Sequence, residues 1–159
     1  MKSHSILLLL ALVPMTLVPP AVAQPVHTHG HAHASAGHDA AFHVPADHVR
    51  WAPDAALLEG MARIRQALHD LAPHEIRPLS DTTVIALADE IDAAIQYLFA
   101  NCRLDPEPDA ALHRILARLM ADSRALHADP SDSSPLAGMQ AALNHYAALF
   151  DDPNALHPH

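Results

Sequence analysis

The chain has 159 residues, half of them hydrophobic and 17% charged, so its length allows one domain with a tail. Its 18 acidic residues against 9 Lys and Arg give a formal net charge of −9, which argues against a nucleic-acid partner because phosphates need cationic side chains. A single cysteine excludes an internal disulfide framework. The 15 histidines are far above ordinary usage and need an explanation.

Residues 1–23 have the pattern of a cleaved secretory signal peptide. Lys2 precedes an apolar run over residues 6–18, and the small residues 21–23 provide a cleavage site. The run is short for a membrane span and prolines interrupt it, so we expect no stable membrane insertion after cleavage. The pattern predicts a periplasmic protein whose mature chain begins at Gln24.

Residues 24–50 form a predicted disordered tail, because their apolar side chains follow neither helical nor strand spacing. The first four of its seven histidines alternate with small residues, which places four imidazoles on one side of an extended chain. Neutral imidazole binds copper, zinc and nickel, and copper(II) binds most tightly. The tail is either a metal-capture segment or a solvated linker without a selected ligand. Its candidate metal ligands are His27, His29, His31, His33, His38, His43 and His48.

From residue 51 to residue 153 the apolar spacing predicts an all-α domain. In chain order, the expected helices are residues 53–71, 81–102, 105–128 and 134–150. Ser80 and Asp105 stand where N-cap residues are expected. The short connections predict an antiparallel up-down-up-down four-helix bundle, followed by a flexible tail over residues 154–159.

Each expected helix carries one apolar stripe with steps of three and four residues, which should face the core. The stripes comprise Leu57, Met61, Ile64, Leu68 and Leu71; Val84, Ala88, Ile91, Ile95, Leu98 and Cys102; Leu112, Leu116, Leu119 and Leu126; and Leu136, Met139, Leu143, Tyr146 and Phe150.

A second candidate metal set comes from the ends of these helices. Cys102 ends the second helix and His113 lies in the first turns of the third, while Met61 is expected at the same level of the first. A thiol, an imidazole and a thioether together suit copper(I). The alternative is that Cys102 is a small buried hydrophobe and that His113 forms a local hydrogen bond.

The motif Phe-Ala-Asn-Cys-Arg-Leu-Asp-Pro at residues 99–106 is followed by Asp109 and by Leu-His at residues 112–113. Together with Tyr146 and Leu-Phe-Asp-Asp-Pro at residues 149–153, it resembles a family of small exported proteobacterial proteins with a histidine-rich amino-terminal tail, often labelled DnrO. The similarity spans residues 51–153. It implies an exported helical protein, and it implies no reaction.

The sequence therefore predicts a periplasmic metal-binding protein, whose tail captures copper, zinc or nickel and whose bundle serves as carrier. No enzyme is expected, because no carboxylate pair, Ser-His-Asp arrangement or HExxH motif is discernible. Two alternatives stay open. One is a protein-interaction or stress-protective helical module for a periplasmic partner protein, with incidental metal chelation, which an exposed apolar surface near Trp51, Phe99 and Phe150 would favour. The other is an electron carrier with non-covalent haem between Met61 and His145.

Overall fold

A computed structural model of the chain describes residues 44–155. The chain divides into two units, Met1–Ala36 and Gly37–His159, and all described residues belong to the second. The predicted signal peptide, the tail ligands from His27 to His43 and residues 156–159 lie outside the described residues.

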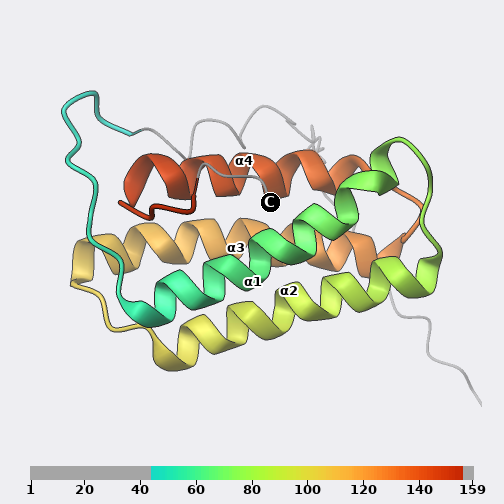
Figure 1. Cartoon of the computed structure of the whole chain (residues 1–159), viewed down its shortest axis with the longest axis horizontal. Coiled ribbons are helices and arrows are strands. Elements are labelled where there is room, and N and C mark those ends of the chain that lie inside the picture. Colours follow the sequence, from blue (N-terminus) through green and yellow to red (C-terminus); the bar gives the residue numbers. More distant parts are fainter. Residues whose placement is uncertain (1–43, 156–159) are drawn as a thin grey trace, which may run out of the picture. The chain divides into compact units, whose positions relative to one another are not determined.

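Residues 44–155 are all-helical and contain no strand. Their elements are α1 (Ala55–Leu71), the 3-10 helix η2 (Ala72–Glu75), α2 (Asp81–Asn101), α3 (Pro106–Ala128) and α4 (Ser134–Leu149), as Figure 1 shows. The prediction of an all-α domain with four α-helices is confirmed.

Two of the four α-helices, α1 and α2, begin at a residue whose side chain caps them, whereas Asp105 stands at the predicted N-cap position of α3 without a side-chain hydrogen bond. The Ser80 hydroxyl accepts a hydrogen bond from the Thr83 amide at 3.2 Å, which confirms the predicted start of α2. The Asp54 carboxylate accepts from the Leu57 amide at 2.6 Å, so α1 begins just after Asp54 rather than at Pro53. At the other end, α2 stops at Asn101 because the backbone of the next residue is extended.

The core is built from the predicted stripes. Every stripe residue except Cys102 has at most 7% of its surface exposed, and Cys102 is half-buried at the C-cap of α2. Burial of one such Leu, Ile or Phe side chain stabilises a fold by about 1.5–3 kcal/mol. The periodicity of the sequence therefore identified the surfaces that hold the helices together.

α-Helices that follow one another in sequence share the largest interfaces, and the contact between α1 and α4 is smaller than any of these. Two glycines permit close approach. A Cβ atom at Gly60 of α1 would overlap the Leu98 side chain of α2, and one at Gly138 of α4 would overlap Arg118 and Asp122 of α3.

Two terminal segments, residues 44–51 and 150–155, are joined beside the end of α4. The Trp51 amide donates to the Leu149 carbonyl at 2.9 Å, and the Asp151 amide donates to the Trp51 carbonyl at 2.9 Å. Val44 and Ala155 also pack against the core. Residues 44–50, which the sequence assigned to the tail, thus lie on the helical unit where it begins.

Candidate functional site

His48 is the predicted tail ligand that falls within the described residues. Its Nε2 atom lies 3.1 Å from the Leu149 carbonyl oxygen, at the last residue of α4. The ring also meets the indole of Trp51 edge-on, with 4.4 Å between centroids and 75° between planes. The structure therefore attaches this half-buried imidazole to the helical unit at two points.

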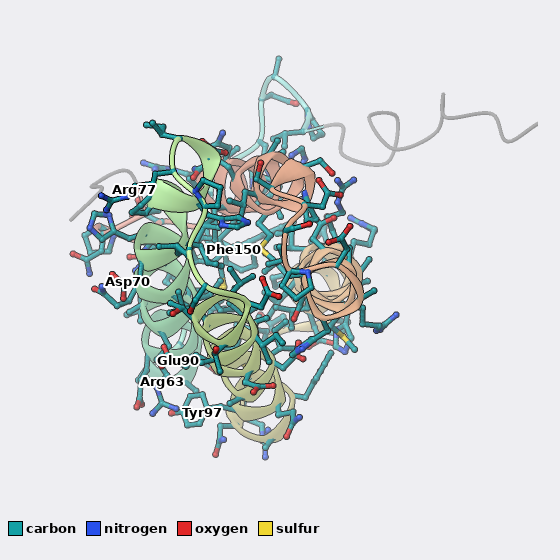
Figure 2. All side chains as sticks on the ribbon, turned by 90° about the vertical axis from the view of Figure 1, so that its right-hand side faces the viewer. Arg63, Asp70, Arg77, Glu90, Tyr97 and Phe150 are labelled. Atoms are coloured by element: carbon teal, nitrogen blue, oxygen red, sulfur yellow. The ribbon has the colours of Figure 1, made fainter. Side chains whose placement is uncertain are left out.

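Aromatic rings continue inward from His48. The ring centroids of Trp51 and Phe150 are 5.6 Å apart, and the Phe150 ring stacks on the Tyr146 ring with 5.1 Å between centroids. Figure 2 shows Phe150 toward the middle of the helical unit, whereas Arg63 and Tyr97 lie at its outside. The aromatic row thus connects the half-buried imidazole with the interior.

A buried polar network closes the inner end of this row. Asp152 accepts hydrogen bonds from the Arg65 guanidinium at 2.8 Å, the Tyr146 hydroxyl at 3.0 Å and the Asn154 amide at 2.8 Å. Burial, and then the neighbouring negative charge of Asp152, raise the pKa of Tyr146 well above its usual range. The network therefore ties the segment after α4 to α1.

The three residues of the predicted copper(I) set lie in different surroundings. Met61 is completely enclosed by the core. Burial, followed by the charges of Asp54 and Asp109, raises the pKa of the Cys102 thiol to about 11, and the thiolate is the form that binds metal. His113 is exposed, with Nδ1 2.9 Å from the Asp109 carbonyl oxygen.

Within residues 44–155, no group of three or more His, Cys, Asp or Glu side chains is arranged to hold a metal ion. In the same range, no helix has the length and apolarity that a membrane span requires.

The sequence pattern does not predict the roles of two buried side chains, His74 and Asp152. His74 is 4% exposed, and its Nδ1 accepts a hydrogen bond from the Leu79 amide at 3.0 Å, which joins η2 to the segment before α2. Asp152 belongs to an Asp-Asp-Pro string, whose spacing predicts the end of a helix and no buried contact. Both roles depend on partners that a periodic pattern does not reveal.

Comparison with known proteins finds no match to a protein-family model, to a curated protein or to a solved structure. The resemblance of residues 51–153 to the exported family therefore stays a prediction from the sequence.

Proposed function

We propose that this protein is a periplasmic metal-binding protein, in which a histidine-rich tail captures copper, zinc or nickel. The helical unit is the carrier, and its helices form an antiparallel up-down-up-down bundle. The packing of consecutive helices through short connections supports this order. Copper(II) is the favoured cargo, because imidazole sites bind it most tightly among these ions.

The observation that carries the proposal is the His-x-His-x-His-x-His run at residues 27–33, with His38 and His43 following it. Several imidazoles close together in the sequence can surround one ion without any preformed pocket. The apolar core of the helical unit is built from residues of its own helices, so we expect this unit to fold without metal. Binding and folding are thus assigned to different parts of the chain.

Calorimetric titration of the exported protein with Cu²⁺, Zn²⁺ and Ni²⁺ tests this proposal. One variant replaces six tail histidines by glutamine, and the matched control replaces the exposed His69 and His113. The first variant should lose most bound equivalents, and the control should keep them. Equal stoichiometry in the two variants would contradict capture by the tail. The six replaced residues are His27, His29, His31, His33, His38 and His43.

Capture should also weaken as the pH falls through about 6.5, because only a neutral imidazole binds metal. A titration at acidic pH should therefore return fewer bound equivalents than one at neutral pH. Binding that is unchanged between these conditions would point to ligands other than histidine.

The two alternatives receive less support from the helical unit. A docking surface at Trp51, Phe99 and Phe150 would need all three rings at the surface, but Phe150 is fully buried and Trp51 is half-buried. Haem ligation would need the Met61 thioether, which the core encloses completely. We therefore retain metal capture as the function to test.

A further inference from the structure

We propose that His74 is an acid-sensitive switch in the connection between α1 and α2, and that this connection opens when the imidazole takes up a proton. The connection comprises η2 and residues 76–80, and it turns the chain back at one end of the helical unit (Figure 1). The inference does not rest on the proposed metal capture, because it involves only residues of the helical unit.

The protonation state of the His74 ring follows from its hydrogen bond. The Leu79 amide donates to Nδ1 at 3.0 Å, so Nδ1 must carry a lone pair and no proton. A neutral imidazole has one ring proton, which must then lie on Nε2. A protonated imidazole carries a proton on both nitrogens and accepts no hydrogen bond. The closed connection therefore requires the neutral ring.

The second ring nitrogen gives an independent observation. Only 4% of the surface of His74 is exposed, and Nε2 is buried without a hydrogen-bond partner among the described residues. Nearly all buried polar groups in folded proteins have a partner, because an unmet buried donor is destabilising. The closed connection thus holds the neutral ring by one hydrogen bond and provides no acceptor for the second proton of a charged ring.

No neighbouring charge compensates a positive ring. η2 packs against α1, and Leu79 lies in the segment that leads into α2. Within residues 44–155, no charged side chain forms a hydrogen bond or an ion pair with His74. The charged or titratable side chains around the connection are all exposed, and they are His69 and Asp70 at the end of α1, Glu75 and Arg77 in the connection, and Asp81 at the start of α2.

Protonation of His74 therefore favours release of the segment before α2. Leu79 packs against the core and directly precedes Ser80, the N-cap of α2. In the open connection the ring is in water, where a histidine titrates near pH 6.5. Because only the open form takes up the proton, the opening equilibrium should rise about tenfold for each pH unit below about 6.5. Closure is thus favoured at neutral pH and weakened as the pH falls.

Hydrogen exchange of the Leu79 amide, followed by NMR from about pH 7 to about pH 5 and corrected for the intrinsic exchange rate, measures this opening. The test variant is His74→Asn, because the Asn Oδ1 atom stands at the position of Nδ1 along the side chain, accepts a hydrogen bond and does not titrate. The matched control is His69→Asn, at an exposed histidine in the last turn of α1. The amide of Ile91, a fully buried residue of α2, reports on unfolding of the whole unit.

We expect the protection of the Leu79 amide to fall about tenfold for each pH unit below about 6.5, both in the unmodified protein and in His69→Asn. Protection of the Ile91 amide should change much less. In His74→Asn, protection of the Leu79 amide should not depend on pH in this range. As a second measurement, the nitrogen resonances of the His74 ring at neutral pH should show the proton on Nε2.

Several results would overturn the proposal. One is protection of the Leu79 amide that stays constant with pH in the unmodified protein, or that falls equally in His74→Asn. Another is an equal loss of protection at Leu79 and Ile91, which would show unfolding of the whole unit instead of a local opening. A neutral ring with its proton on Nδ1 would also contradict the switch. If His74→Asn does not fold, the exchange and the ring resonances of the unmodified protein decide the outcome.

Discussion

The carboxylate of Asp152 lies 2.8 Å from the guanidinium of Arg65, and both side chains are almost completely enclosed, with 0% and 9% of their surfaces exposed. The pair joins the segment after α4 to α1. It therefore strengthens the edge of the helical unit at which the two terminal segments meet.

Replacing Asp152 by Asn should lower the free energy of unfolding by about 3–5 kcal/mol, because it leaves the Arg65 charge buried without a counter-charge. Its neighbour in sequence is the matched control. Asp151 pairs with Arg50 at the surface, where the two side chains are 67% and 46% exposed. Asp151→Asn should cost at most about 1 kcal/mol. Urea unfolding measures both, and equal losses would contradict a structural role for the buried pair.

Tyr146 should make the protein sensitive to alkaline pH. Its folded pKa lies above the usual value of 10.0, so its contribution to stability is complete below about pH 10 and is lost as the pH rises further. Cys102, whose pKa rises from 9.0 to about 11, adds a smaller loss in the same direction. Tyr146→Phe should reduce the alkaline loss of stability.

The tyrosinate absorbance checks this prediction. Tyr97, the other tyrosine, lies at the surface and donates to Glu59 at 2.6 Å, which also raises its pKa. Tyr97→Phe should reduce the alkaline loss of stability less than Tyr146→Phe does, because solvent screens the exposed Tyr97 side chain. Ionisation of Tyr146 should coincide with unfolding, and a folded protein that ionises both tyrosines together would refute this account.

The close approach of α1 and α2 at Gly60 can be tested with alanine. In an exposed helix interior this change stabilises by about 0.8–1.0 kcal/mol, but here the new methyl group would overlap the buried Leu98 side chain. Gly60→Ala should therefore destabilise by about 1–3 kcal/mol. Gly138→Ala should cost less, because the far end of the Arg118 side chain can move. Thermal unfolding gives the order of the two variants, and the reverse order would contradict this packing.

Cys102 should react slowly with alkylating agents. A thiol pKa of about 11 instead of 9.0 lowers the thiolate fraction at neutral pH about 100-fold. Iodoacetamide labelling should be slow in the native protein, accelerate towards pH 11 and become fast in urea. Asp109→Asn, which removes one nearby negative charge, should modestly increase the native rate. Rapid labelling of the native protein at neutral pH would show a lower pKa than this environment supports.

The helical stripes could be predicted because burial of a helix face repeats every three or four residues along the chain. Leu57 to Leu71 and Val84 to Leu98 accordingly lie in the core as expected. The contacts of residues 44–51 and 150–155 produce no such regular spacing in the sequence. His48 and Leu149, or Arg65 and Asp152, are far apart in sequence, and a single long-range contact produces no local pattern.

For the candidate metal site, the sequence predicts only the chemical type of the ligands. The alternation of histidines from His27 to His33 indicates metal ligands without any knowledge of the fold. The copper(I) set was inferred from helix ends alone, which do not reveal that Met61 is enclosed or that burial, followed by two nearby carboxylates, raises the pKa of Cys102. The orientation of His48 likewise depends on the end of a helix about a hundred residues away.

The proposal depends on a metal ion held by the histidine tail in the native protein. Elemental analysis of the protein isolated from its own organism, without added metal or chelator, can detect that ion. We expect copper, zinc or nickel in at least stoichiometric amount, and the loss of this metal from the variant in which the six tail histidines are replaced. Recovery of the unmodified protein without these metals would show that the tail does not hold them.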